Sequence, residues 1–170
     1  MGAGDGLVCG KAARRARSDH ETNTDKQRHG GIQLNETIKQ KALGVCEVLY
    51  NKKALDIVAI HVADKTIVAD WFIICSGRAV QQVKSLADEV DHKAEELGLT
   101  LRRSEGYGEG KWVVLDFADI LVHIFYPDER KYYNMERLWD EDDSAIRYSL
   151  LREEEEREAA RLKKEQGAKE

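Results

Sequence analysis

The sequence predicts a mixed α/β domain with the element order α-β-β-α-β-β-β-α, a mixed sheet of about five strands and a charged C-terminal helix. Two runs, 55–62 and 68–76, are apolar on both faces, which is typical of strands in the middle of a sheet. Apolar residues in 79–97 recur at alternating spacings of three and four, which indicates an amphipathic helix. The runs 112–117 and 120–126 lie too close together for a crossover, so they indicate an antiparallel hairpin.

The first helix is predicted from about residue 37 to residue 51. Its apolar residues are spaced by four, four and three positions and form one stripe: Ile38, Ala42, Cys46 and Leu49. The second helix follows Ser76 and Gly77, where a serine can cap free N–H groups, and Gly98 is a natural stop for it.

Shorter elements are predicted in the second half of the domain. A strand at 100–103 leads into a glycine-rich loop, and the hairpin follows. Pro127, the single proline, ends the hairpin and introduces a helical segment that runs to Trp139. From Ser144 onward the sequence predicts a highly charged helix, whose first turns dock on the domain and whose remainder is solvated.

Composition divides the chain into three parts. Residues 1–33 are rich in glycine and polar residues, which predicts a disordered N-terminal extension. Residues 34–143 are the predicted domain, and residues 144–170 are the charged C-terminal helix or tail. Arginines early in the extension resemble the start of an organelle transit segment, but acidic residues in the same stretch argue against one.

The distribution of charge disfavours direct binding of nucleic acid. The formal net charge is -5, and residues 34–139 carry fourteen Lys and Arg against seventeen Asp and Glu. Because sequence-independent affinity comes largely from neutralised phosphates, an acidic domain is a poor candidate for direct RNA or DNA contact. No apolar run approaches the ~20 residues of a membrane span. Cys46 and Cys75 lie in apolar patterns, which indicates buried thiols in a reducing compartment.

Three segments resemble ligand sites but have simpler explanations. The loop 106–111 resembles a phosphate loop, yet a strand is predicted after it instead of a helix N-terminus. Ser76-Gly77 does precede a helix, where either a bound anion or a serine cap fits. The acidic run 140–143 could attract a cation or a basic partner, and it also precedes a predicted helix start, where negative charge is favourable.

The sequence shows no nucleophile–base pair and no metal-ligand spacing. His61 and His123 lie in predicted strands without a third ligand at a suitable distance along the chain. Asp116 and Asp119 flank a two-residue turn, which explains both. We therefore expect no catalytic residue, metal or cofactor.

Aromatic residues and arginine concentrate in residues 130–139, directly after the hairpin. The stretch contains Arg130, Tyr132, Tyr133, Glu136 and Trp139. Such a concentration is typical of a protein contact more than of a reaction centre.

With this stretch as the last of five ordered blocks, the chain resembles the ribosomal silencing factor family, also called the Iojap family. The resemblance runs from about residue 43 to residue 139. The first block, 52–57, is a basic entry to a strand, and the second, 69–77, is an A-D-aromatic-F-hydrophobic-S-G strand. The third, 105–116, is a Glu-Gly pair ahead of the first hairpin strand, and the fourth, 122–125, is the second hairpin strand. The fifth, 130–139, is a closing R-x-x-Y-x-L-E-x-L-W motif. Two residues depart from the pattern. Ala118 replaces a usual Gly, at a cost on the order of 1 kcal/mol if the turn needs a positive φ, and Met135 replaces a usual Leu.

The resemblance implies a nucleotidyltransferase-like fold without catalytic carboxylates. It implies a protein that binds the large ribosomal subunit through ribosomal protein fourteen, blocks joining of the small subunit sterically and so represses translation. The cytoplasm is the expected compartment, with the mitochondrion or chloroplast as alternatives, and a homodimer is suggested. There are two alternatives. One is an assembly factor for the large subunit, and the other is a nucleotide-binding enzyme that uses Ser76-Gly77 and Asp116.

The expected partner-binding residues are the exposed members of the matching blocks. They are Asp70, Trp71, Trp112, Asp116, Arg130, Tyr133, Glu136 and Trp139. Trp71, Trp112 and Leu138 could instead belong to the core, because a tryptophan in an apolar strand is buried more often than it is a binding hot spot.

Overall fold

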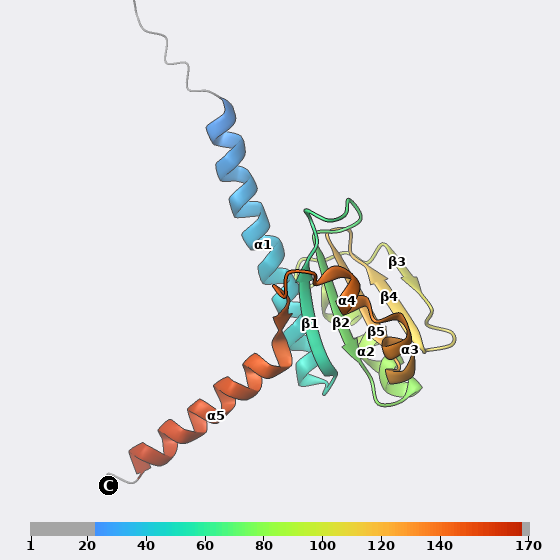
Figure 1. The fold of residues 1–170 in the computed structure, drawn as a ribbon, viewed down its shortest axis with the longest axis vertical. Coiled ribbons are helices and arrows are strands. Elements are labelled where there is room, and N and C mark those ends of the chain that lie inside the picture. Colours follow the sequence, from blue (N-terminus) through green and yellow to red (C-terminus); the bar gives the residue numbers. More distant parts are fainter. Residues whose placement is uncertain (1–22, 168–170) are drawn as a thin grey trace, which may run out of the picture.

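A six-stranded mixed sheet lies at the centre of the computed structural model, which describes residues 23–167, with side chains from 34 to 166. The elements, in chain order, are α1 (Asn23–Asn51), β1 (Leu55–His61), β2 (Trp71–Ser76), α2 (Val80–Ala94), β3 (Arg103–Glu105), β4 (Trp112–Asp116), β5 (Ile120–Phe125), α3 (Pro127–Tyr133), α4 (Met135–Trp139), β6 (Ile146–Arg147) and α5 (Tyr148–Gly167). The strand order is β3-β4-β5-β2-β1-β6 (Figure 1), and neighbouring strands are antiparallel except for the parallel pair β2 and β5. The predicted mixed α/β class is confirmed.

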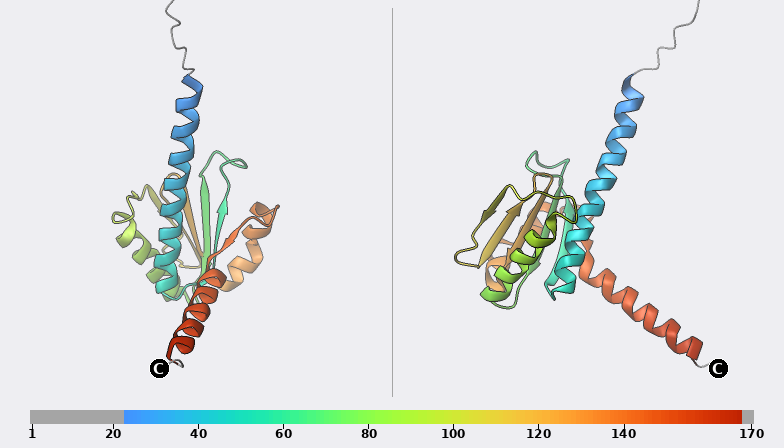
Figure 2. Two further views of the ribbon diagram at one scale, coloured as in Figure 1. Left: turned by 90° about the vertical axis from the view of Figure 1, so that its left-hand side faces the viewer. Right: turned by 180° about the vertical axis from the view of Figure 1, so that it is seen from behind.

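Helices α1 and α2 cover one face of the sheet (Figure 2). Every residue of the central strands β2 and β5 is buried, as the apolar pattern on both faces of β2 predicted. The larger core lies between the two helices and this face, and Leu49, Leu86 and Ile73 are among its members. Cys46 and Cys75 are buried in it as free thiols, as predicted.

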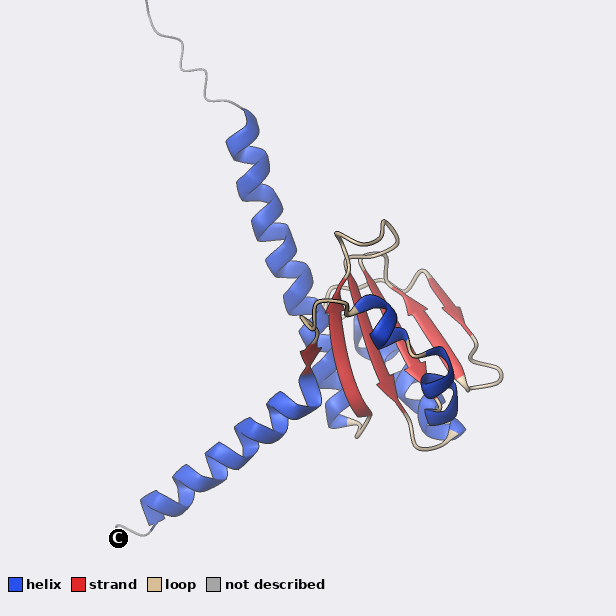
Figure 3. Cartoon of the chain, in the orientation of Figure 1, coloured by secondary structure: helices blue, strands red, loops and turns tan. Residues whose placement is uncertain are grey.

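The short helices α3 and α4 lie across the opposite face (Figure 3). Beneath them is a smaller core that includes Phe72, Ile74 and Phe125. Strand β4 is only partly covered on this side: Val113 and Leu115 are buried, but the residues that alternate with them are only half-buried. The second face is therefore incompletely shielded from solvent near the β3–β4 edge of the sheet.

Helix α1 is longer than predicted, because it begins at Asn23 instead of near residue 37. Residues 23–33, expected to be disordered, are helical, whereas the expectation for residues 1–22 lies outside the described residues. Each glycine of the Gly30-Gly31 pair costs a helix about 1 kcal/mol relative to alanine. The packed C-terminal half of α1 supplies the helix nucleus, however, so the extension needs only propagation. The division of the chain into an extension (1–33), a domain (34–143) and a charged tail (144–170) stays a prediction.

The segment from Pro127 to Trp139 is two helices where one was predicted. Asn134 separates them with a φ of 43°, in the left-handed region, and its backbone N–H donates to the carbonyl of Arg130 at 2.9 Å. Asparagine tolerates this conformation better than most residues with a side chain. The chain therefore changes direction at Asn134 and carries α4 across the sheet.

Strand β6 was not predicted, so the sheet has six strands instead of about five. Its two residues, Ile146 and Arg147, pair with Ala59 and Val58 of β1. A pairing of two residues leaves no periodic pattern in a sequence. The strand predicted at 100–103 also lies slightly later, at β3.

The first turns of α5 pack on the domain, as predicted, although not through the expected leucines. The Oγ of Ser149 accepts a hydrogen bond from the backbone N–H of Ile57 at 3.0 Å and so extends the edge of β1. Leu150 and Leu151 are exposed. All residues from 153 to 166 are exposed, as the prediction of a solvated helix requires.

The predicted hairpin is confirmed as β4 and β5, and its turn places Ala118 at a φ of 71°. The backbone N–H of Ala118 donates to Oδ1 of Asp116 at 2.8 Å. Asp116 therefore has the turn-forming role expected from the sequence.

We expect Ala118→Gly to stabilise the protein by up to about 1 kcal/mol, because glycine adopts a positive φ without a Cβ clash. Ala118→Val should instead lower the stability, since β-branched residues tolerate this region poorly. Urea denaturation of the three proteins measures both changes. A midpoint for Ala118→Gly at or below that of the wild type would contradict the prediction.

Candidate partner-binding surface

Six aromatic side chains meet on the sheet face that α3 and α4 cover, which we call the aromatic face. They come from β2, β4, β5, α3 and α4: Phe72, Trp112, His123, Phe125, Tyr133 and Trp139. The ring of Trp112 stacks on Phe125 with centroids 4.9 Å apart and lies 4.6 Å from Tyr133. Trp139 meets Phe72 edge-on at 5.1 Å. The residues of the closing motif are therefore packed against the strands of the hairpin and of β2.

The solvent-accessible side chains at and beside the aromatic face form a surface that we call the docking surface. Tyr132 is 82% exposed and Tyr133 48% exposed, and their rings contact one another with centroids 5.0 Å apart. Trp112, Val114 and Asp116 complete it as the half-buried side of β4. Exposed aromatic residues beside apolar and acidic groups are typical of a protein contact.

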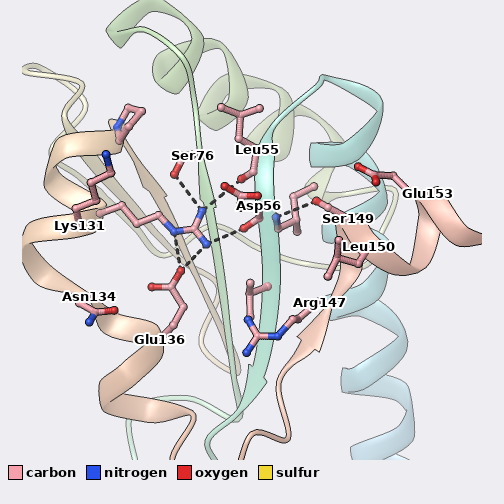
Figure 4. A pocket seen from close by; sticks show the side chains of 14 residues that line it. Leu55, Asp56, Ser76, Lys131, Asn134, Glu136, Arg147, Ser149, Leu150 and Glu153 are labelled. Atoms are coloured by element: carbon pink, nitrogen blue, oxygen red, sulfur yellow. Dashed lines mark hydrogen bonds and ion pairs between the residues drawn. The ribbon is translucent and has the colours of Figure 1, made fainter.

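Arg130 ties the docking surface to the ends of two strands. Its Nε–H donates to Oε1 of Glu136 at 2.6 Å, and its Nη1–H donates to Oγ of Ser76 at 3.0 Å and to the carbonyl of Leu55 at 3.4 Å. Its Nη2–H donates to the carbonyl of Asp56 at 2.7 Å. Figure 4 shows these groups converging in the wall of a cavity of about 520 Å³ between α3, β1 and the start of α5.

Arg130 and Glu136 are thus more buried than expected, with side chains 13% and 21% exposed. Their ion pair joins α3 to α4, and the remaining donors of Arg130 hold both helices against the sheet. The structure therefore supports a positioning role for the pair, in which it fixes where Tyr133 lies.

The serine cap expected at Ser76 is not formed. The hydroxyl of Ser76 accepts from Arg130, and the N-cap residue of α2 is Ala79, which makes no side-chain cap bond. Instead Oε1 of Gln82 accepts from the backbone N–H of Arg78 at 2.7 Å. The helix begins too far along the chain for the Ser76 side chain, which belongs to β2, to cap it.

Trp71 lies on the other side of the sheet from the docking surface. It is 7% exposed within the larger core, so the expectation of an exposed Trp71 is wrong and its core alternative is confirmed. Side chains alternate along β2, which turns Phe72 and not Trp71 toward the aromatic face. Asp70, which directly precedes β2, is half-buried.

Sequence reasoning also misjudged two exposed residues. Leu138, considered a core candidate, is 63% exposed, and Tyr132, which was left out of the expected site, is the most exposed aromatic residue of α3. Val114 was missed as well. The sequence did contain a usable signal: Val114 stands two positions after Trp112 in a predicted strand, so both side chains lie on the same side of it.

The residues considered for nucleotide chemistry do not converge. Ser76 of β2 pairs with Phe125 of β5, and Phe125 pairs with Trp112 of β4, so these three residues lie in one row at one end of the sheet. Asp116 is four residues further along β4, which is about 13 Å at the usual rise of a strand. In the described range 23–167, no group of three His, Cys, Asp or Glu is placed to hold a metal ion.

The acidic run 140–143 forms local ion pairs. Asp142 pairs with Lys65 of the β1–β2 loop at 3.2 Å. Asp143 and Asp140 both pair with Arg147 of β6, at 3.0 and 3.5 Å. The run therefore fastens the chain between α4 and β6, and it does not directly precede a helix as predicted.

His123 is a buried structural residue of the aromatic face. Its Nδ1 accepts a hydrogen bond from Nε1–H of Trp112 at 3.3 Å, and its Nε2 has no partner within the described part of the chain. Burial lowers the pKa of His123 from 6.5 to about 4. The imidazole is therefore neutral near pH 7 and orients Trp112.

Comparison with known proteins identifies similar chains. The family model described as ribosomal silencing factor during starvation matches residues 35–170. A ribosomal silencing factor of Bacillus subtilis is 40% identical over 103 residues, which cover 61% of this chain and 85% of the relative. One of Halalkalibacterium halodurans is 39% identical over 105 residues, covering 62% and 87%. A crystal structure of a Chromobacterium violaceum protein has a TM-score of 0.58 at 34% identity and covers 60% of this chain and 85% of that one.

A more distant relative comes from an animal. A mouse protein named mitochondrial assembly of ribosomal large subunit protein 1 is 29% identical over 98 residues, which cover 54% of this chain and 42% of that protein.

None of the helices in residues 23–167 combines the length and the apolar character needed to cross a membrane.

Proposed function

Because the chain belongs to the ribosomal silencing factor family, we propose that it binds protein fourteen of the large ribosomal subunit and sterically blocks joining of the small subunit. The observation that carries the proposal is the docking surface, where the aromatic side chains of Tyr132 and Tyr133 are exposed next to the half-buried side of β4. A monomer gains nothing from leaving such side chains in solvent, whereas a partner buries them.

The charge of the domain supports a basic protein as the partner. Residues 34–139 carry fourteen Lys and Arg against seventeen Asp and Glu. Asp116 lies on the same half-buried side of β4 as Trp112, four residues further along the strand, so an acidic group is available at the far end of the docking surface. Charge complementarity of this kind steers association with a basic protein and disfavours direct contact with phosphates.

The expected site residues have three different roles in this function. Trp112, Asp116 and Tyr133 contact the partner, with Asp70 and Trp139 near the border of the contact. Arg130 and Glu136 position these residues through their ion pair, and Trp71 supports the sheet from the opposite face.

We expect Tyr133→Ala to weaken binding to the isolated large subunit by about tenfold or more, since a half-exposed aromatic residue at the centre of a contact is a typical hot spot. Sedimentation of the protein with separated subunits through a sucrose gradient measures both comigration with the large subunit and loss of assembled ribosomes. The matched control is Tyr107→Ala. Tyr107 is 40% exposed but lies beside α2, where its hydroxyl donates to Asp88 at 2.9 Å.

Tyr107→Ala should bind like the wild type. Equal binding by Tyr133→Ala, in a variant whose melting curve shows that it is folded, would exclude the docking surface. Failure of the wild type to comigrate with the large subunit at low salt would exclude the proposed function as a whole.

Assembly of the large subunit is the second candidate function, and the name of the mouse relative favours it. The two functions could use one contact but differ in the particle that is bound. Comigration with immature particles would favour assembly, and comigration with mature free subunits would favour silencing. The bacterial relatives support the cytoplasm as the compartment, with the mitochondrion or chloroplast as alternatives.

A further inference from the structure

Helix α5 projects away from the sheet at the edge formed by β1 and β6 (Figures 1 and 2). Its 20 residues correspond to about 30 Å of helix. Residues 153–166 are exposed without exception. This part of α5 therefore buries no side chain in the core, and the domain does not need it for packing.

The base of α5 is nevertheless fixed to α1. The hydroxyl of Tyr148 donates to the carboxylate of Glu47, and Arg152 forms an ion pair with the same carboxylate at 3.4 Å. The ring of Tyr50 meets that of Tyr148 edge-on at 6.2 Å and lies under the guanidinium of Arg152 at 5.6 Å. One turn further along, Glu156 accepts a hydrogen bond from the hydroxyl of Tyr50 at 3.1 Å.

These contacts surround the first two turns of α5 and couple them to the packed end of α1. Burial and the hydrogen bond to Glu47 raise the pKa of Tyr148, so its hydroxyl keeps its proton and remains a donor. A helix held in this way by several side chains keeps one direction relative to the sheet. The exposed part of α5 is thus an arm with a defined orientation.

The arm and the docking surface lie toward opposite edges of the sheet. In the strand order β3-β4-β5-β2-β1-β6, the docking surface is built on β4, and α5 leaves from β6. Strands β5, β2 and β1 therefore separate the part of the sheet that carries the docking surface from the edge where the arm leaves. The arm adds to the volume from which the bound protein excludes other molecules.

We infer that α5 acts as a steric arm that excludes the small subunit and that it does so separately from binding to the large subunit. This inference rests on the proposed function. It assigns the two halves of that function to different parts of the chain: contact to the docking surface, and a large share of the obstruction to residues 153–167 of α5.

Removal of residues 153–170 tests the separation. The deleted chain loses the hydrogen bond from Tyr50 to Glu156 but keeps Tyr148, Ser149 and Arg152. It should bind the isolated large subunit with a Kd within about twofold of the full chain. It should need about tenfold more protein to halve the formation of assembled ribosomes, because steric exclusion is a negative coupling between two binding events. Light scattering during subunit joining measures the second quantity.

A pair of full-length variants controls for the loss of chain. Glu158→Pro kinks the arm by removing a helical hydrogen bond, whereas Glu158→Ala leaves the helix intact. The proline variant should block subunit joining less well than the wild type, and the alanine variant should block it equally well.

Three results would overturn parts of this scheme in distinguishable ways. Undiminished blocking by the deleted chain would show that the arm is not the obstruction. Loss of large-subunit binding by the deleted chain would show that α5 belongs to the contact, which contradicts the separation. Absence of binding by the full chain would refute the proposed function itself.

Discussion

Arg130→Ala is expected to lower the free energy of unfolding by about 3 kcal/mol, because it removes one partner of a largely buried ion pair and leaves the other charge in place. Glu136 would lose its counter-charge, and the carbonyls of the half-buried Leu55 and the exposed Asp56 would lose donors. The hydroxyl of Ser76 would lose its donor as well. Urea denaturation monitored by tryptophan fluorescence measures the loss.

Two matched variants show whether the geometry of Arg130 matters. Arg130→Lys keeps the charge but not the planar fork, so it should recover only part of the stability. Lys131→Ala alters the exposed neighbour on the same helix and should change the free energy of unfolding by less than about 0.5 kcal/mol. A loss below about 1 kcal/mol for Arg130→Ala would show that the contacts of the guanidinium are not the attachment of α3 and α4.

The stability of the protein is expected to fall by about 2 kcal/mol between pH 7.5 and pH 5 because of His123 alone. The pKa of His123 is lowered from 6.5 to about 4 by burial among aromatic rings. Between these two values the unfolded chain binds a proton that the folded chain does not, so acidification favours unfolding. The contribution is fully present above pH 6.5 and is lost as the pH falls toward 4.

His123→Gln isolates this contribution, because the variant keeps a polar side chain but does not titrate in the range. Carboxylates also titrate at acid pH, but they do so in both proteins, so the difference between the two pH profiles reports on His123. The profile of His123→Gln should be flatter by the stated amount. Parallel profiles from pH 7.5 to 5 would mean that the histidine is not excluded from water in solution.

Periodic segments were predictable from the sequence, and segments fixed by single contacts were not. Helix α2 and the β4–β5 hairpin repeat an apolar pattern over several turns or residues, and both lie where they were expected. Strand β6 has only two residues, and the turn at Asn134 depends on one backbone conformation. Neither produces a pattern that a sequence displays.

The candidate site was predictable as a stretch of chain but not residue by residue. The closing motif does supply Tyr133 and Trp139 to one face of the sheet. Trp71 was misplaced because its strand is apolar on both sides, so that alternation alone does not tell which side is covered by helices. Arg130 was misjudged because its partners, the carbonyls of Leu55 and Asp56, are some seventy residues away and invisible to local patterns.

The parallel pairing of β2 with β5 has a consequence for the synthesis of the chain. Trp71 pairs with Ile120 and Ser76 with Phe125, so the two central strands are separated by 49 positions along the chain (120 minus 71). Non-local pairs of this kind form late, because a long loop must close before they do. A growing chain can pair β1 with β2 early, but one side of β2 then stays open until β5 has emerged from the ribosome. During that interval the nascent protein carries an unpaired apolar strand, which is the stage at which association with another chain would divert it from its fold.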